Sequence, residues 1–125
     1  MIFSEVAEFS KEFKKLAKKY KTLESDIHVF KTFIENLYEC EDEKLREIFQ
    51  KKYFDGKRAT ELTPPNSEIV VVKARFDCAY LNKDCLRIIY LKNENKIKLI
   101  ELYNKADKNR EDPNRIKFYQ SDIKL

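Results

Sequence analysis

The stretch CLRIIYLKNENKIKLIELYNKADKN, from Cys85 to Asn109, decides the fold of this chain. The run Leu86–Lys92 alternates Leu86, Ile88 and Tyr90 against Arg87, Ile89 and Leu91, and Lys96–Asn104 alternates in the same way, which is typical of β-strands. The three residues Asn93-Glu94-Asn95 separate the two runs, and they suit a tight turn because Asn tolerates left-handed backbone. The stretch therefore predicts a β-hairpin.

The alternation also predicts which side chains of the hairpin share a face. In the second strand we expect one face to carry Ile97, Leu99, Glu101 and Tyr103, and the other Lys98, Ile100 and Leu102. Polar and cationic groups also gather along the hairpin, namely Arg87, Tyr90, Tyr103 and Lys105. Cations and aromatic groups on a rigid sheet suit an anion, and a nucleic acid is the obvious large anion.

Composition places the chain among globular proteins of one domain. It has 125 residues, of which 42% are apolar and 38% charged, and this length suits a single hydrophobic core. No apolar run is long enough to cross a bilayer, and the N-terminus has no signal-like segment. The three cysteines lack metal-type spacing and are expected to be reduced. We predict a soluble cytoplasmic protein, 1–125, without membrane association.

Positive charge is concentrated in the second half of the chain. Residues 1–68 contain 13 Lys and Arg against 14 Asp and Glu, a net charge of −1. Residues 69–125 contain 13 against 8, a net charge of +5. The strand-rich half is therefore where a polyanion would dock, although ordinary solubility charge explains the same numbers.

The first half of the chain predicts a strand and two helices. Residues 2–8 alternate as a short strand does. Ser10 is a candidate N-cap for the first helix, with a start two or three residues earlier as the alternative, and Thr22 for the second. The first helix has an apolar face of Phe9, Phe13, Leu16, Ala17 and Tyr20, and the second has one of Leu23, Ile27, Phe30, Ile34 and Leu37. Two such helices with a short turn between them predict an antiparallel hairpin.

The remaining segments complete an α+β order. Residues 40–66 are a divergent connection in which the apolar pattern suggests a short third helix, and Pro64 and Pro65 end it. The β-branched run 69–76 predicts a central strand. Pro113 suits the first turn of a last helix, 112–122. We predict an antiparallel sheet of three to four strands, with the helical hairpin packed on one face and a short C-terminal helix.

Several types of catalytic site are absent from the sequence. His28 is the only histidine, and it lies beside an apolar stripe, where a surface or boundary position is expected. The carboxylate pairs, such as Glu94 with Glu101, have no diagnostic spacing and lie among cations, which predicts solvated or ion-paired roles. The chain has no Walker, dinucleotide or zinc motif. We predict no metal and no cofactor.

The basic and aromatic set on the strands is the remaining candidate site. Adjacent strands bring residues such as Lys73, Arg75 and Arg87 to within about 5 Å of each other, an unfavourable cluster of like charges unless an anion neutralises it. RNA cleavage without metal or histidine is chemically feasible there, with a tyrosinate or neutral lysine as base and arginines on the phosphate. The alternative is that the tyrosines are half-buried and the cations only solubilise the sheet.

The order of these segments resembles the RelE/ParE superfamily of bacterial type II toxins. The likeness is carried by FSKEFKKLAKKYKTL, VVVKARF, LRIIYL, KIKLIELYNKADKN and EDPNRIKFY, which together cover the chain except residues 40–66. The resemblance implies a small toxin neutralised by an antitoxin that an adjacent gene encodes. RelE-type members are ribosome-dependent endoribonucleases that cut mRNA, whereas ParE-type members share the fold and poison DNA gyrase.

The hypothesis of an mRNA-cleaving toxin assigns roles to particular residues. Arg75, Arg87 and Lys105 bind or stabilise the phosphate, Lys73 positions the backbone or transfers a proton, and Tyr103 stacks or acts as base. Additional RNA contacts are expected from Lys83, Tyr90, Lys108 and Arg110. The chain departs from the RelE pattern after its last strand, where an arginine and a catalytic tyrosine are expected. Three hypotheses therefore stand: an mRNA-cleaving toxin, a non-nuclease binder that inhibits gyrase, and an inactive homologue.

Overall fold

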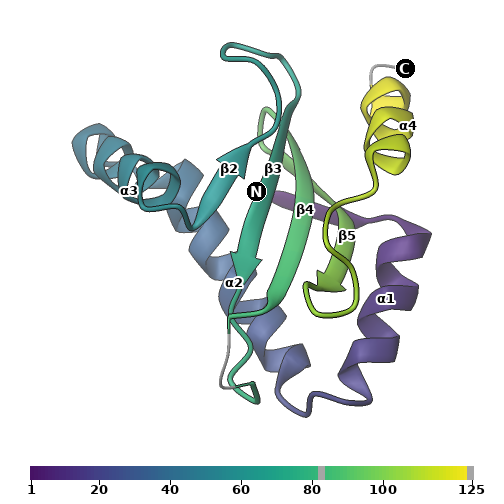
Figure 1. Ribbon diagram of the computed structural model, residues 1–125. Coiled ribbons are helices and arrows are strands. Elements are labelled where there is room, and N and C mark those ends of the chain that lie inside the picture. The colour runs from purple at the N-terminus through teal and green to yellow at the C-terminus, as the bar shows by residue number, and fades with distance from the viewer. Residues whose placement is uncertain (82–83, 124–125) are drawn as a thin grey trace.

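Within the described residues, 1–81 and 84–123 of the computed structural model, five strands form one mixed sheet (Figure 1). They are β1 (Ile2–Glu5), β2 (Ala59–Glu61), β3 (Val70–Phe76), β4 (Leu86–Asn93) and β5 (Lys96–Asn104). Their order across the sheet is β1-β5-β4-β3-β2. The predicted hairpin is confirmed as β4 and β5, and it lies at the centre of the sheet rather than at an edge.

The hairpin contains a bulge that the alternation did not predict. Ile89 pairs with Glu101, but the next residue, Tyr90, pairs with Leu99, so Ile100 is an extra residue in β5. Side chains beyond the bulge therefore change faces relative to a regular strand. Glu101 and Tyr103 share a face with Lys98, Arg87 and Ile89, whereas the other face carries Ile97, Leu99, Leu102, Ile88 and Tyr90. The expected grouping of β5 residues was wrong for this reason.

Two helices of the first half supply most of the core on one face of the sheet. In α2 (Leu23–Glu39) all five residues of the predicted stripe are buried, and Phe30 packs against Phe76 and Tyr90 with ring centroids 5.5 and 6.3 Å apart. In α1 (Ala7–Ala17) Phe9 and Leu16 are buried. The helix begins three residues before Ser10, which was the earlier start considered.

The pairing of β1 corrects the prediction of an antiparallel sheet. The predicted strand 2–8 ends at Glu5, and it pairs with β5 in parallel, from Ile2 opposite Lys96 to Glu5 opposite Leu99. Beyond Leu99 the outer edge of β5 is covered by side chains instead of a strand. Glu12 accepts the Leu102 N–H at 3.1 Å, and Arg115 donates to the Ile100 carbonyl at 3.1 Å, so these edge groups are satisfied.

The connection 40–66 holds more regular structure than its sequence indicated. Helix α3 (Glu43–Asp55) has 13 residues, and the Asp42 side chain caps it by accepting the N–H groups of Lys44 and Leu45 at 3.0 and 3.1 Å. After it, β2 adds an edge strand that pairs with β3. The sheet therefore has one more strand than the three to four predicted.

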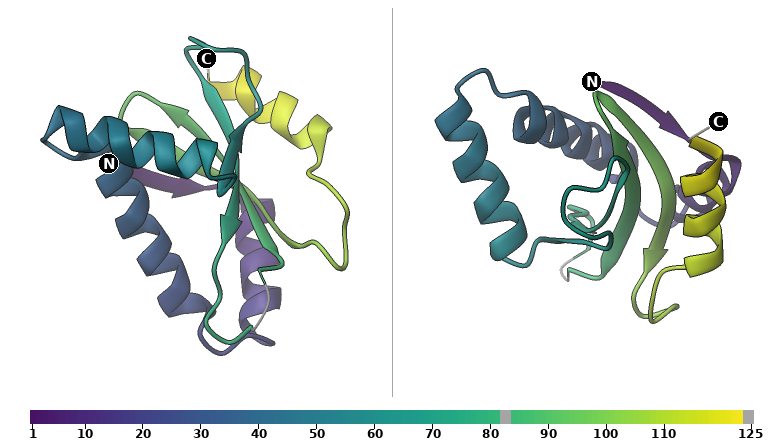
Figure 2. Two further views of the ribbon diagram at one scale, coloured as in Figure 1. Left: turned by 60° about the vertical axis from the view of Figure 1, so that its left-hand side comes forward. Right: turned by 90° about the horizontal axis from the view of Figure 1, so that it is seen from above.

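The last helix covers the opposite face of the sheet from α2 and α3 (Figure 2). Helix α4 (Pro113–Ile123) begins with proline, and Asp112 caps it by accepting the N–H groups of Asn114 and Arg115. Ile116 is buried, and Tyr119 donates to Glu8 of α1 at 2.6 Å. The predicted C-terminal helix is thus confirmed, and it shares its face of the sheet with the basic residues.

We expect truncation of the α2 stripe to destabilise the fold strongly. Leu23 is fully buried, so Leu23→Ala should lower the free energy of unfolding by about 2–5 kcal/mol. Leu62→Ala is the matched control, since Leu62 is 39% exposed, and its cost should stay below about 1 kcal/mol. Urea unfolding followed by circular dichroism measures both. Equal losses in the two variants would contradict this account of the core.

Candidate anion-binding site

Four of the predicted site residues come together on the face of the sheet that α4 partly covers. Arg75 of β3 pairs with Arg87 of β4, and Arg87 pairs in turn with Tyr103 of β5. Directly paired residues point to the same face, and Lys73 lies two residues from Arg75 and so shares it. The row Arg75, Arg87 and Tyr103 therefore crosses three neighbouring strands.

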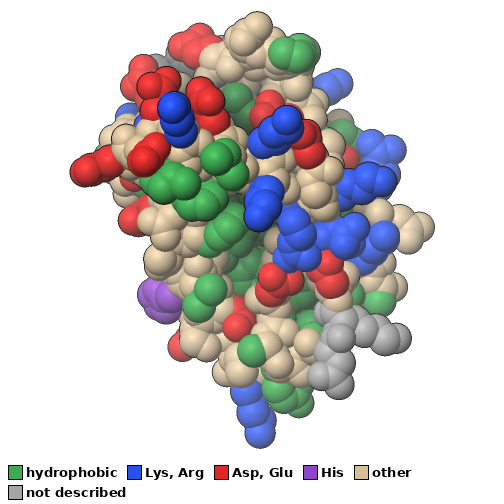
Figure 3. Space-filling model, turned by 90° about the vertical axis from the view of Figure 1, so that its left-hand side faces the viewer, with side chains coloured by type: hydrophobic (Ala, Val, Ile, Leu, Met, Phe, Trp, Pro, Cys, Tyr) green, Lys and Arg blue, Asp and Glu red, His purple; other side chains and the backbone are tan. Residues whose placement is uncertain are grey.

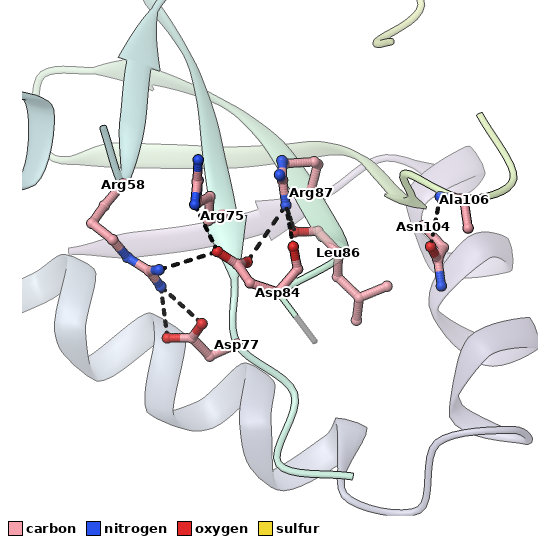
Figure 4. A network of polar contacts seen from close by, with 8 residues as sticks. All are labelled: Arg58, Arg75, Asp77, Asp84, Leu86, Arg87, Asn104 and Ala106. Carbon is pink, nitrogen blue, oxygen red and sulfur yellow. Dashed lines mark hydrogen bonds and ion pairs between the residues drawn. The ribbon is translucent and has the colours of Figure 1, made fainter. Parts of the chain in front are cut away.

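Asp84 binds three arginines at the end of this row (Figure 4). Its Oδ2 atom lies 3.0 Å from Arg75 Nη1 and 3.3 Å from Arg58 Nη1, and its Oδ1 atom lies 3.5 Å from Arg87 Nη1. Arg58 also forms a two-bond contact with Asp77, at 2.7 and 2.8 Å. Three guanidinium groups and two carboxylates leave a net charge of +1. We call Arg58, Arg75 and Arg87 the arginine cluster.

The sheet fixes the positions of the three guanidinium groups. Arg87 is only 8% exposed, and its Nη1 atom donates to the carbonyls of Leu86 and Asp84 at 3.0 and 3.3 Å. Arg58 precedes β2, and its own carbonyl accepts the Arg75 N–H at 2.9 Å. Backbone pairing therefore places these residues side by side, and the ion pairs with Asp84 and Asp77 hold the guanidinium groups of Arg58 and Arg75.

The sequence analysis missed Arg58 and Asp84. Arg58 lies in the connection 40–66, where no periodic pattern marks a strand, and it joins the cluster only because β2 pairs with β3. Asp84 lies in the loop before β4, which is adjacent to the cluster only in the folded chain. No local signal in the sequence distinguishes either residue from an ordinary surface charge.

Tyr103 is too buried and too weakly acidic to act as a base near neutral pH. Burial raises its pKa to about 12, and the charges of Glu111 and Glu101 add to this effect. Its hydroxyl has no hydrogen-bond partner in the described part of the chain. Lys108 lies with its Nζ atom 5.7 Å from the centre of the Tyr103 ring, a cation–π distance. The predicted role of Tyr103 as base is therefore not supported by its surroundings.

A fully buried carboxylate lies beside Tyr103. Glu101 accepts the Asp112 N–H at 2.9 Å and forms an ion pair with Lys108. Buried charge is costly unless it is paired and hydrogen-bonded, so these two contacts fix the segment 105–112 against the sheet. The prediction that Glu101 is ion-paired is confirmed, but its carboxylate is buried rather than solvated.

Lys73 forms an ion pair with a second carboxylate of the same segment. Its Nζ atom lies 3.1 Å from Glu111 Oε2. Burial by itself would raise the pKa of the Glu111 carboxyl, but hydrogen bonds from its own backbone N–H and from Lys73 outweigh burial, and the pKa is lowered. Glu111 is therefore ionised at neutral pH, close to both Lys73 and Tyr103. The sequence analysis did not select it.

The other predicted RNA contacts have different positions. Tyr90 is fully buried on the α2 face, where its hydroxyl lies 2.8 Å from that of Tyr38. The prediction that Tyr90 contacts RNA is therefore wrong, because burial in the core excludes contact with a ligand on the other face. Lys105 and Arg110 are exposed in the segment between β5 and α4. Lys83 lies outside the described residues.

Other kinds of site are limited in the described chain. His28 is exposed, as predicted, and the three cysteines are free. The described residues contain no group of His, Cys, Asp and Glu that could hold a metal ion. None of the described helices is long and apolar enough to cross a membrane. The arginine cluster is thus the polar site with the most convergent donors among those considered above.

No family model, curated protein or solved structure matches this chain.

We expect removal of the Tyr103 hydroxyl to leave the protein as stable or more stable at pH 7, since Tyr103→Phe removes a buried group without a partner. The pKa of Tyr103 is raised from its ordinary value of 10.0 to about 12 by folding. Its contribution to the free energy of unfolding is therefore constant below about pH 10 and falls as the pH rises from 10 toward 12. This decline should be smaller in Tyr103→Phe. Denaturant unfolding from pH 7 to 12 measures both effects.

Tyr90→Phe is the matched control, because it removes a hydroxyl that is hydrogen-bonded to Tyr38. It should lower the free energy of unfolding at pH 7 by about 0.5–1.5 kcal/mol. A loss in Tyr103→Phe as large as that in Tyr90→Phe would show that the Tyr103 hydroxyl has a partner in solution.

Proposed function

We propose that this protein is a RelE/ParE-like toxin that binds mRNA through the arginine cluster and cleaves it. One observation carries the proposal: a single carboxylate, that of Asp84, contacts all three guanidinium groups at 3.0–3.5 Å. Asp84 therefore marks where the oxygens of an anion are bound. A phosphodiester, like a carboxylate, spreads one negative charge over two unesterified oxygens, and arginine binds phosphate in a two-bond geometry.

The chemistry of cleavage follows from the groups around this point. In the proposal, the ionised Glu111 accepts the proton of the ribose 2′-hydroxyl, and the 2′-oxygen attacks the phosphorus. The bond from phosphorus to the 5′-oxygen breaks, Lys73 donates a proton to that oxygen, and a 2′,3′-cyclic phosphate remains. The arginines stabilise the negative charge that builds on the phosphate. Tyr103 stays neutral and takes no proton.

The cleavage proposal is tested by expression in cells. We expect the wild-type chain to arrest growth and to generate new mRNA 5′ ends, and Arg87→Ala to abolish both effects. Arg46→Ala is the matched control, since Arg46 lies on α3 and donates to the Cys40 carbonyl. New ends that persist at wild-type levels in Arg87→Ala, or that also vanish in Arg46→Ala, would contradict a specific role for the cluster.

Removal of the internal anion gives a second test. Asp84→Asn should strengthen binding of a short single-stranded RNA, on the order of tenfold at low salt, because it removes a competing negative charge between the arginines. Fluorescence anisotropy with labelled RNA measures the change, and the gain should shrink as salt rises. Asp55→Asn, which changes an exposed carboxylate at the end of α3, is the control. Equal affinities for all three proteins would contradict anion binding at Asp84.

The proposed partners follow from the same surface. A cognate antitoxin encoded by an adjacent gene would cover the cluster with an acidic segment that folds on binding, and the ribosome with its mRNA would be the target in the cytoplasm. Co-expression with the product of the adjacent reading frame tests this part. We expect it to relieve growth arrest and to form a complex that is stable during purification.

A non-nuclease binder that inhibits gyrase is the second candidate. The high pKa of Tyr103 favours it over a nuclease that uses Tyr103 as base, because the Tyr103 hydroxyl stays protonated at neutral pH. This candidate predicts supercoiling defects with intact mRNA, whereas the nuclease predicts cut mRNA with normal supercoiling. An inactive homologue predicts neither effect and no growth arrest.

A further inference from the structure

A second feature of the molecule is an apolar groove between α2 and α3. It has a volume of about 830 Å³. Val29, Phe30 and Phe33 of α2 line one side, and Leu45, Phe49 and Tyr53 of α3 line the other. Seen from this side, hydrophobic side chains gather in a hollow with Lys and Arg side chains beside it (Figure 3). The groove is thus open to a partner.

Helix α3 presents much of its apolar stripe to solvent. Leu45, Ile48 and Phe49 are 44, 52 and 40% exposed, and Tyr53 is the buried residue of the helix. On α2 the facing residues Val29 and Phe33 are 69 and 44% exposed. These residues follow the i, i+3, i+4 spacing of a buried helix face, and a contiguous exposed patch of this kind marks an interaction surface.

The charges of α3 are segregated along its length. Residues 41–47 contain four acidic residues (Glu41, Asp42, Glu43 and Glu47) against Lys44 and Arg46, a net charge of −2, while residues 51–58 contain four basic residues (Lys51, Lys52, Lys57 and Arg58) against Asp55, a net charge of +3. This arrangement suits the helix dipole at the N-terminus. It also makes the helix complementary to a second copy of itself in the antiparallel direction.

We propose that the protein forms a symmetric dimer in which α3 of each copy lies antiparallel in the α2–α3 groove of the other. A two-fold axis near Arg46 and Glu47 would bring Leu45 of one copy opposite Ile48 of the other, and Glu41 opposite Lys52. Such an interface uses the same patch twice, as two-fold dimers do. The helices present a face of roughly 20 by 20 Å per copy, which is smaller than the interfaces of stable dimers, so a weak and reversible dimer is expected.

This inference goes beyond the proposed function and does not rest on it. Arg58 and Arg75 line the end of the groove as well as forming part of the arginine cluster. The antiparallel dimer would therefore place the acidic start of the partner's α3 toward the end of the groove that Arg58 and Arg75 line. Loss of RNA cleavage and loss of dimerisation are separate measurements, and either result leaves the other open.

Sedimentation equilibrium of the full chain tests the dimer. Between about 1 and 200 μM, a range that spans the affinity expected of a small interface, the wild-type mass should rise from 15.1 kDa toward twice that value. Phe49→Asp should remain monomeric at every concentration. Phe118→Asp is the matched control, because Phe118 is 64% exposed on α4, on the opposite side of the sheet, and it should dimerise as the wild type does.

A charge reversal at exposed positions tests the antiparallel direction of the two α3 helices. Lys52→Glu and Glu41→Lys should each weaken dimerisation several-fold at low salt, and the double variant should restore it. Lys11→Glu is the control, since Lys11 is exposed on α1 and does not line the groove. A wild type that stays monomeric to the highest concentration, or single variants that dimerise as well as the wild type, would overturn the proposal.

Discussion

The bulge at Ile100 is the constraint on which the functional face of the sheet depends. Without the extra residue, β5 would present Glu101 and Tyr103 to α2 and place a carboxylate in the apolar core. The shift at Ile89 and Tyr90 instead turns both side chains to the face that carries Arg87. Because side chains alternate with a period of two, one inserted residue exchanges the faces of all that follow. This single bulge therefore separates the polar residues on one face of the sheet from the hydrophobic core on the other.

The buried Glu101 then determines where the C-terminal segment lies. Its contacts with Lys108 and with the Asp112 N–H hold the segment against the sheet and bring Glu111 next to Lys73. The Glu101 carboxylate is fully buried although the Lys108 side chain is 39% exposed, and a buried charge is costly without its partners, so these contacts hold the segment in place. The same segment starts α4, whose Arg115 satisfies the open edge of β5. The position of the last helix and the composition of the basic face are therefore linked.

The basic face was largely predictable because it lies within regular strands. Lys73 and Arg75 share a face from alternation alone, and Arg87 joins them once β4 pairs with β3. Tyr90 was misplaced because its polar hydroxyl suggested an exposed position, while tertiary packing gives it Tyr38 as partner in the core. Arg58, Asp84 and Glu111 were missed because they come from an irregular connection and from loops, where local sequence carries no information about which strand lies nearby.

The sequence by itself determined the helices, the central hairpin and the two ends of α4, since hydrophobic period, turn residues and capping groups act over a few neighbouring positions. Only the tertiary structure decided that β1 runs parallel to β5, that β2 completes the sheet, and that one aspartate gathers three arginines. These features depend on which segments meet across long stretches of chain. Pairing direction and loop contacts produce no periodic pattern in the sequence, because the residues that meet lie tens of positions apart in the chain.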